Sequence, residues 1–244
     1  MITLNKPVVI VVGADKGGVG KTTVSRTMLD YLQSKDVPVR AFDTETPRGT
    51  LKRFHGSQTE VVDITTTPGQ MRIFDSLMNG SPAVNLIDVR AGVMSTALKS
   101  LKEIGFLEAV KAGQITFMVF HVLGSSIASL DEIVDTAAFM EGVKYHLVKN
   151  HVSNNTFFEW DKDVYESYFS KIQGAVGVEI PKLDEMAFEQ VETAAVPFLK
   201  FVADKNAFDE TAKFSFVLRG RVRHWLADVW SEYDRIGLMT AVGA

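Results

Sequence analysis

Short apolar runs alternate with amphipathic stretches along most of the chain. Each run has the length of a strand and is bounded by turn or polar residues, a pattern typical of strands buried on both faces. The predicted strands cover residues 8–12, 39–42, 84–89, 115–123, 145–148 and 176–180. Apolar residues at helical spacing predict helices over residues 22–33, 94–110, 127–140, 160–172 and 216–235.

The alternation of strands and helices predicts an α/β fold with a doubly wound, mainly parallel sheet flanked by helices. Ligands of such sheets bind beyond the carboxyl ends of the strands. Polar residues that close the predicted strands are therefore the first candidates for a functional site. Three of these strand ends carry acids or an amide: Asp43 with Glu45, Asp88, and Asn150.

A glycine-rich loop links the first predicted strand to the first predicted helix. Residues 16–22 read Lys-Gly-Gly-Val-Gly-Lys-Thr. Glycines let the backbone curl until several N–H groups point at a phosphate, the second lysine adds positive charge, and the threonine hydroxyl can hold Mg²⁺. A merely flexible turn is the alternative, which the flanking strand and helix disfavour. We therefore predict a nucleoside triphosphate site. Its binding residues are Lys16, Gly17, Gly18, Val19, Gly20, Lys21, Thr22 and Thr23.

Two positions separate this loop from the common phosphate-binding pattern. Asp15 stands where that pattern has a glycine, and Lys16 precedes the first pair of glycines. In these features the sequence resembles the deviant Walker ATPases of the ParA/MinD family, which are P-loop NTPases. The resemblance implies a homodimer in the ATP state, with Lys16 reaching across the interface to the partner's phosphates. It makes Lys16 and Lys21 candidate catalytic residues.

The resemblance also suggests roles for the acids at the strand ends. Family members carry two acids one residue apart after the second strand, and Asp43 and Glu45 match them, which makes both candidate catalytic residues. The second acid orients or activates the attacking water, and this chain has Glu45 where Asp is usual. Asp88 closes a buried strand as a Walker B acid does, so we expect Thr22, Asp88 and Asp43 to hold Mg²⁺. Without the glycine-rich loop, each acid would be interpreted as an ordinary cap.

Asn150 and Pro181 are candidate contacts of the nucleotide base. The resemblance implies an Asn that reads the adenine edge at position 150, and an Ile-Pro step that lines the base pocket at Pro181. An isolated Asn at a strand end is also a common turn residue, and both interpretations stay open. The Asn-Lys-x-Asp motif of GTPases is not found in this register, which favours ATP over GTP.

Composition excludes several classes of protein. The chain has 244 residues, 46% of them hydrophobic, and we interpret residues 1–244 as one P-loop domain. Its net charge of −4 gives no global basic field, so DNA contacts have to come from a local patch. The absence of cysteine excludes disulfides and cysteine-held metal clusters. Neither a signal peptide nor an apolar run of roughly 20 residues is evident, so we expect a cytoplasmic protein.

The predicted helix over residues 216–235 has a basic first half. Arg219, Arg221 and Arg223 lie there, and residues 195–225 contain six Lys or Arg against three Asp or Glu. This stretch is a candidate for nonspecific contacts with DNA phosphates, with a solvated helix face as the alternative. Residues 236–244 contain no Lys or Arg, which disfavours stable membrane association through a basic amphipathic helix. We interpret the aromatic cluster in residues 157–169 as core packing rather than as a partner surface.

These inferences combine into a ParA-like function. The resemblance implies an ATP-sandwich dimer that binds DNA without sequence preference until a cargo-associated protein stimulates slow ATP hydrolysis. Such a nucleoid-associated switch serves the segregation or positioning of a plasmid, a chromosome or another large cargo. Two alternatives remain open: a MinD-like, membrane-cued regulator of the division site, and a P-loop phosphotransferase that acts on a small acceptor.

Overall fold

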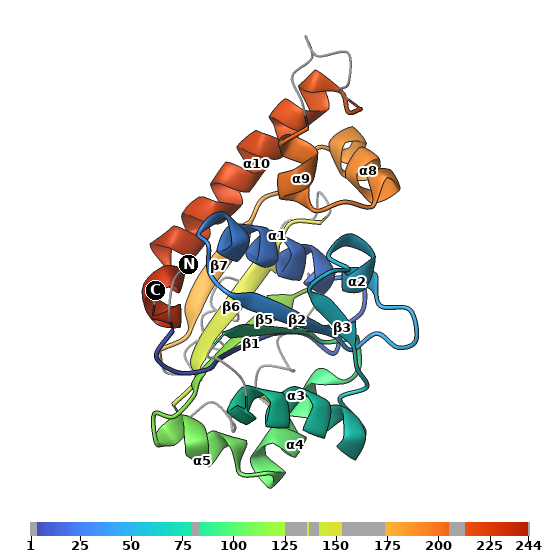
Figure 1. The fold of residues 1–244 in the computed structure, drawn as a ribbon. Coiled ribbons are helices and arrows are strands. Elements are labelled where there is room, and N and C mark those ends of the chain that lie inside the picture. The colour runs from blue at the N-terminus through green and yellow to red at the C-terminus, as the bar shows by residue number, and fades with distance from the viewer. Residues whose placement is uncertain are drawn as a thin grey trace.

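A parallel sheet of seven strands lies at the centre of the part of the chain that the structure describes (Figure 1). This computed structural model describes residues 4–79, 83–124, 136, 142–152, 174–204 and 213–243. The strands are β1 (Val8–Gly13), β2 (Val39–Asp43), β3 (Thr59–Val61), β4 (Val84–Asp88), β5 (Thr116–Leu123), β6 (Lys144–Asn150) and β7 (Val176–Ile180). Their order is β3-β2-β4-β1-β5-β6-β7, and every neighbouring pair is parallel. The predicted parallel α/β fold is therefore confirmed.

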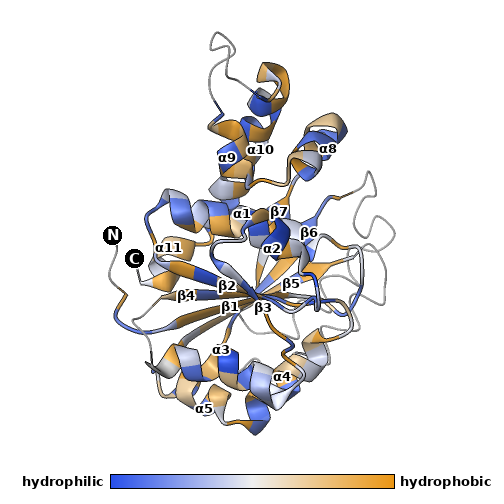
Figure 2. Ribbon diagram, turned by 45° about the vertical axis from the view of Figure 1, so that its right-hand side comes forward, coloured by the Kyte–Doolittle hydropathy of each residue, from blue (hydrophilic) through white to orange (hydrophobic). Residues whose placement is uncertain are grey.

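Helices cover both faces of this sheet (Figures 1 and 2). The helices α1 and α2 lie over one face, and α3, α4 and α5 lie over the opposite face. The described helices are α1 (Lys21–Ser34), α2 (Thr50–Phe54), α3 (Thr67–Asn79), α4 (Met94–Glu103), α5 (Phe106–Lys111), α8 (Glu185–Ala194), α9 (Phe198–Val202), α10 (Phe216–Arg235) and α11 (Leu238–Val242). We call α8, α9 and α10 the C-terminal arm, because they rise together above α1 at the top of Figure 1.

The side chains of β1 show how one apolar run fills two cores. Val8, Ile10 and Val12 belong to the core on the side of α1 and α10. Val9 and Val11 belong to the second core, which packs against α3, α4 and α5. Successive residues of a strand point to opposite faces of the sheet, so an unbroken apolar strand buries both of its sides.

The long helix α10 belongs to the C-terminal arm and also packs against the rest of the fold. Its apolar stripe is buried against α1, and the hydroxyl of Tyr233 lies 2.8 Å from Oγ1 of Thr27 on α1. The side chain of Ser215 caps the helix by accepting a hydrogen bond from the N–H of Leu218. The helix predicted over residues 216–235 is confirmed at both ends.

Several elements differ from the prediction. The helix predicted over residues 94–110 is divided into α4 and α5 at Gly105, whose φ of 74° is left-handed and costs glycine little. The strand β3 has only three residues, two of them half-buried at the edge of the sheet, so its apolar signal is weak. The helices predicted over residues 127–140 and 160–172, and the aromatic cluster 157–169, fall outside the described residues apart from Thr136. Among the helices that are described, none has the length and apolarity that crossing a bilayer demands.

We expect Leu226→Ala to lower the free energy of unfolding by about 2–5 kcal/mol, because this buried side chain belongs to the core that α10 shares with α1. The matched control is His224→Ala, an exposed position on the same helix, which should change stability by less than about 0.5 kcal/mol. Urea denaturation followed by circular dichroism measures both variants. Equal effects of the two substitutions would contradict this packing of α10.

Candidate functional site

One cavity of about 610 Å³ lies at the carboxyl ends of β1, β2 and β4. It gathers residues of the glycine-rich loop, the acids that close β2 and β4, and single residues from α2 and α8. Its lining consists of Gly17, Gly18, Gly20, Lys21, Thr22, Thr23, Asp43, Glu45, Thr50, Asp88, Val89, Arg90, Ala91, Val152 and Phe188. Residues far apart in the sequence, which were predicted to share a site, therefore lie together.

The glycine-rich loop owes its shape to two left-handed glycines. Gly18 has a φ of 74° and Gly20 a φ of 84°, a region that other residues rarely adopt. Gly20 is also the N-cap of α1, so the N-terminus of this helix, whose first N–H groups have no acceptor within the helix itself, faces the cavity. Nζ of Lys21 donates to the main-chain oxygen of Lys16 over 2.8 Å, which closes the loop. The loop thus has the form of an anion site.

Asn150 holds this loop from the end of β6, which is two strands away from β1 in the sheet. Its side-chain Nδ2 donates to the carbonyl of Val19 over 3.1 Å and to the carbonyl of Gly20 over 3.3 Å. The amide is buried, so these bonds are shielded from water. A Cβ atom on Gly20 would lie 2.2 Å from Nδ2 of Asn150, which explains the glycine at this position. Asn150 therefore positions the loop, a role that the sequence alone did not reveal.

Asp88 lies at the end of β4 beneath the loop. One carboxylate oxygen accepts from the hydroxyl of Thr22 and the other from the hydroxyl of Ser25, both over 2.8 Å. Burial, with a further contribution from the nearby carboxylate of Asp43, raises the pKa of Asp88 to about 7, against the opposing effect of these hydrogen bonds. A buried carboxylate whose charge is disfavoured in this way is suited to a bound cation.

Asp43 and Glu45 have different surroundings. Both oxygens of the buried Asp43 accept main-chain hydrogen bonds, from the N–H of Glu45 over 2.9 Å and from the N–H of Lys52 over 3.1 Å. Burial nevertheless raises the pKa of Asp43. Glu45 is exposed at the cavity and accepts a hydrogen bond from the hydroxyl of Thr50. Asp43 thus shapes the loop after β2, while Glu45 presents a solvated carboxylate to the cavity.

Two residues that the sequence did not single out as site residues connect the loops around the cavity. The hydroxyl of Thr44 accepts from the N–H of Arg90 over 2.8 Å, which joins the loops after β2 and β4. The carbonyl of Asp15 accepts from the N–H of Gly92 over 2.8 Å, and its carboxylate accepts from the N–H of Ser95 in α4. Asp15 therefore fastens the glycine-rich loop to the loop after β4. No local pattern signals these bonds, because each partner is at least 46 residues away.

A second, smaller cavity of about 190 Å³ lies beside the first. It contains Asn150 and Pro181, the two residues predicted to meet the base. Trp225 of α10 also lines it and donates its indole N–H to the carbonyl of Pro181 over 2.6 Å. Three residues line both cavities: Thr23, Val152 and Phe188.

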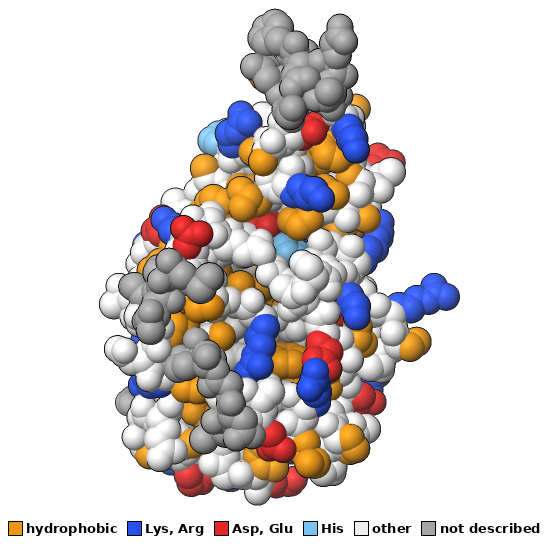
Figure 3. Space-filling model, viewed as in Figure 1, with side chains coloured by type: hydrophobic (Ala, Val, Ile, Leu, Met, Phe, Trp, Pro, Cys, Tyr) orange, Lys and Arg blue, Asp and Glu red, His pale blue; other side chains and the backbone are white. Residues whose placement is uncertain are grey.

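The basic residues of α10 differ in their exposure. Arg219 is buried and donates to the main-chain carbonyl of Asp204. The prediction that Arg219 contacts DNA is therefore corrected, because a buried guanidinium bound to a carbonyl is not presented to a duplex. Arg221 is exposed but lies 3.0 Å from the carboxylate of Asp184, and Arg223 is exposed. Figure 3 shows Lys and Arg side chains spread over the C-terminal arm with hydrophobic side chains between them.

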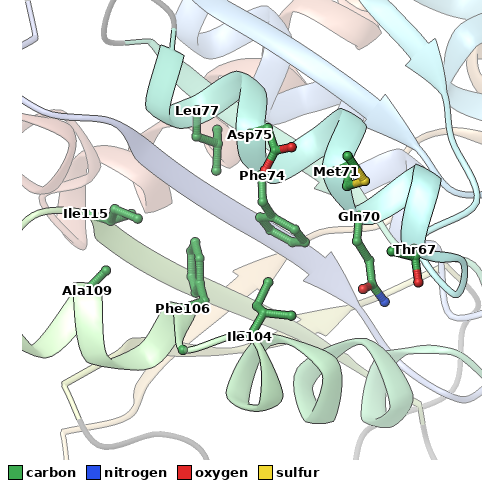
Figure 4. Close-up of a pocket in the computed structure, with 11 residues that line it drawn as sticks. Thr67, Gln70, Met71, Phe74, Asp75, Leu77, Ile104, Phe106, Ala109 and Ile115 are labelled. Atoms are coloured by element: carbon green, nitrogen blue, oxygen red, sulfur yellow. The ribbon is translucent and has the colours of Figure 1, made fainter.

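A cavity of about 320 Å³ lies apart from this site, between α3 and α5 (Figure 4). Phe74, Phe106 and Ile115 face its interior, and Asp75 is the one charged side chain among its described lining residues. It contains no residue of the glycine-rich loop and no strand-end acid. We therefore assign the predicted chemistry to the larger cavity at the strand ends.

The residues at the larger cavity fit a Mg²⁺ ion that is shared with a nucleotide. Such an ion takes oxygen ligands, needs only one or two protein groups and completes its shell with phosphates and water. The hydroxyl of Thr22 and the carboxylate of Asp88 are adjacent and supply these oxygens. No group of three or more His, Cys, Asp or Glu is arranged to hold a metal within the described ranges, so an all-protein metal cage is not formed there.

Comparisons with known proteins agree with this geometry. A sequence profile described as the CobQ/CobB/MinD/ParA nucleotide-binding domain matches residues 10–214. No curated protein matches the sequence significantly. A solved nucleotide-binding protein from Archaeoglobus fulgidus, in complex with ADP, is similar in fold, with 16% identity and a TM-score of 0.54 over 85% of this chain and 93% of that chain.

Two further solved structures are more distant. The MinD cell division protein of Aquifex aeolicus has 15% identity and a TM-score of 0.49, over 91% of this chain and 97% of that chain. A plasmid partition protein from Borrelia burgdorferi has 14% identity and a TM-score of 0.48, over 80% of this chain and 99% of that chain.

We expect Gly20→Ala to weaken ATP binding at least about tenfold, because the new Cβ would displace Asn150 from the loop. Gly18→Ala is the matched control: it has a similar left-handed backbone, but no atom lies within 4 Å of the new Cβ. Calorimetric titration compares the two. In the double variant Gly20→Ala with Asn150→Gly, the clash with the amide is gone, while the backbone strain and the close approach to Cγ1 of Val152, at 2.7 Å, remain. Equal losses for both single variants would contradict the role of Asn150.

The raised pKa of Asp88 predicts a dependence on pH. Without ligand, the folded chain keeps a proton that the unfolded chain releases, so the contribution of Asp88 to the free energy of unfolding falls as pH rises from about 4 to about 7. Mg²⁺ needs the ionised carboxylate, so Mg²⁺-dependent ATP binding should strengthen about tenfold between pH 6 and pH 8.

The measurement is the change in Mg²⁺-dependent ATP affinity across this pH range, compared between the wild type and Asp88→Asn. The comparison is needed because the phosphates of the ligand titrate as well. Asp30→Asn is the control. Burial also raises the pKa of Asp30 to about 7, but this carboxylate accepts from the N–H of Leu199 in α9 and does not line the cavity. Asp30→Asn should change the pH dependence of stability and leave the Mg²⁺ effect intact. An unchanged Mg²⁺ effect in Asp88→Asn would contradict the metal assignment.

Proposed function

The chain belongs to the CobQ/CobB/MinD/ParA family of nucleotide-binding domains, and on this basis we propose that it is an ATPase that works as a ParA-like partition or positioning switch. The observation that carries the proposal is the meeting of Lys21, Thr22, Asp88 and Glu45 at one cavity. A phosphate-binding loop, a buried metal-binding acid and an exposed acid are the parts that hydrolysis of a nucleoside triphosphate requires.

In the proposed site, the loop and Lys21 bind the phosphates of ATP. Thr22 and Asp88 hold Mg²⁺, which when bound neutralises phosphate charge. Glu45 orients the attacking water, since its carboxylate is exposed at the cavity. Asp43 keeps the loop that carries Glu45 in place through its two main-chain hydrogen bonds. Its proposed role is therefore positioning rather than direct metal binding.

We propose ATP rather than GTP as the nucleotide. The Nδ2 of Asn150 is engaged by two loop carbonyls, which directs the acceptor oxygen of the same amide away from the loop. An acceptor at the base pocket suits the exocyclic amine of adenine, whereas guanine presents a carbonyl oxygen at the equivalent position. The side chain can thus hold the loop and read the base at once.

Dimerisation is the proposed source of the switch. Lys16 is partly exposed at the rim of the loop and is not among the described residues that line the cavity of its own chain. We propose that its ammonium group neutralises phosphate charge in the partner's site when two chains close face to face. Loss of the γ-phosphate on hydrolysis would then weaken the dimer and release whatever the dimer holds.

The C-terminal arm is the proposed contact with DNA. Arg223, Lys200 and Lys213 are exposed on or beside this arm and offer charges to a phosphate backbone. Contacts of this kind position a protein without reading sequence. A membrane contact through α11 is less favoured, because its Leu238 and Val242 are buried in the core.

Nonspecific duplex binding and light-scattering mass, each measured with ATP, ADP and no nucleotide, test this proposal together. We expect an ATP-dependent dimer whose DNA affinity falls as salt rises. Replacing Arg223 and Lys213 with Ala should reduce the slope of log affinity against log salt by about 1–2. Arg72→Ala, an exposed arginine on α3 that pairs with Glu60, is the control and should leave the slope unchanged.

Variants of Lys16 provide the second part of this experiment. Lys16→Ala should abolish the ATP-dependent dimer, and Lys16→Gln separates the loss of charge from the loss of length. A dimer and hydrolysis rate unchanged in Lys16→Ala would contradict the trans-acting lysine. Pelleting of the ATP form with liposomes would instead indicate a membrane-cued regulator, and fast turnover only with a small acceptor would indicate a phosphotransferase.

A further inference from the structure

The two neighbouring cavities of the site have only a few lining residues in common. Besides Thr23 of α1, only Val152 and Phe188 line both cavities among the described residues. A ligand with its phosphates on the glycine-rich loop and its base in the smaller cavity has to pass these side chains. The ring of Phe188 is the one aromatic group at this passage.

The side chain of Phe188 is exposed, although two of its apolar neighbours on α8 are buried. It leaves 37% of its surface accessible, while Ala187 and Val191 on the same helix are fully buried in the core. Val152 leaves 49% of its surface accessible. An apolar surface held open at the mouth of a polar cavity gains stability when an apolar partner covers it. The flat face of a nucleotide base is such a partner.

The helix that carries Phe188 is fixed relative to the glycine-rich loop. Glu192, one turn further along α8, pairs with the buried Arg26 of α1. The guanidinium of Arg26 lies between two aromatic rings, 3.5 Å from the centroid of Phe54 and 4.1 Å from that of Phe198. Since α1 begins at Lys21 in the loop, this buried pair sets the ring of Phe188 at a defined place relative to the phosphates.

The N-terminus of α8 is fixed as well. The carboxylate of Asp184 accepts from the N–H of Ala187 over 3.0 Å, and the carbonyl of Asp184 accepts from the N–H of Phe188 over 2.9 Å. The first turn of the helix is therefore capped. A ring on a capped helix loses little conformational freedom on binding, so contact with a base is not offset by a large ordering cost.

We propose that Phe188 positions the nucleotide by stacking its ring on the base at the passage between the two cavities. This inference rests on the proposed nucleotide-binding function and adds to it a residue whose contribution is independent of hydrogen-bond recognition. Every base has a π face, so stacking strengthens the binding of purine nucleotides without distinguishing ATP from GTP. A ligand without a base gains nothing from the ring.

The test compares ATP, GTP and inorganic tripolyphosphate by calorimetric titration in the presence of Mg²⁺. Phe188→Ala should weaken ATP and GTP by a similar factor, about tenfold to a hundredfold, and leave tripolyphosphate unchanged. Phe188→Tyr should retain the affinity of the wild type, because it keeps the ring. Met186→Ala, the most exposed apolar position on the same helix, is the matched control and should change none of the three affinities.

Phe188→Trp adds a spectroscopic readout. The new indole should show a change of fluorescence on addition of ATP, relative to the wild type, and no change on addition of tripolyphosphate. Unchanged ATP affinity in Phe188→Ala would overturn the stacking role and leave the proposed ATPase intact. Equal losses of ATP and tripolyphosphate would also overturn it, since the ring would then support the loop. If the wild-type chain binds neither tripolyphosphate nor ATP at any concentration tested, both proposals are overturned.

Discussion

Two buried carboxylates stand side by side at the ends of neighbouring strands, and the site is built around them. The parallel register of β2 and β4 pairs Asp43 with Asp88. Burial raises the pKa of both groups, and the nearby carboxylate of Asp43 raises the pKa of Asp88 further. The protein satisfies Asp43 with main-chain N–H groups and Asp88 with two hydroxyls. The carboxylate of Asp88 lies next to the hydroxyl of Thr22 in the glycine-rich loop, where a cation can meet both the carboxylate and the phosphates.

Helix α1 links the larger cavity to the C-terminal arm. Helix α1 begins at the loop, and its buried residues reach the arm through the pair of Arg26 with Glu192 and the contact of Thr27 with Tyr233. Trp225 of α10 and Phe188 of α8 both line the smaller cavity. A change at the loop therefore has a continuous packed path to the surface that carries the exposed basic residues, which gives the proposed switch a physical basis.

The sequence predicts those features that depend on local pattern. Short, mainly apolar runs predicted six of the seven described strands, and the run of glycines and lysines predicted the loop. It did not predict β3, whose three residues carry little apolar signal, or the helices α3 and α8. Helical periodicity distinguishes an apolar face from a polar one, but it could not reveal that Asp204 would cover Arg219. The roles of Thr44, Asp15 and Asn150 as loop anchors depend on partners brought together only by the fold.

An equilibrium titration of the wild-type chain with ATP, carried out once with Mg²⁺ and once with EDTA, tests the account of this site most directly. We predict saturable binding of one ATP per chain that weakens when Mg²⁺ is removed, because Thr22 and Asp88 would then lose the ion they share with the phosphates. Absence of saturable binding, or binding of equal strength with Mg²⁺ and with EDTA, would contradict the assignment of this cavity as a magnesium-dependent nucleotide site.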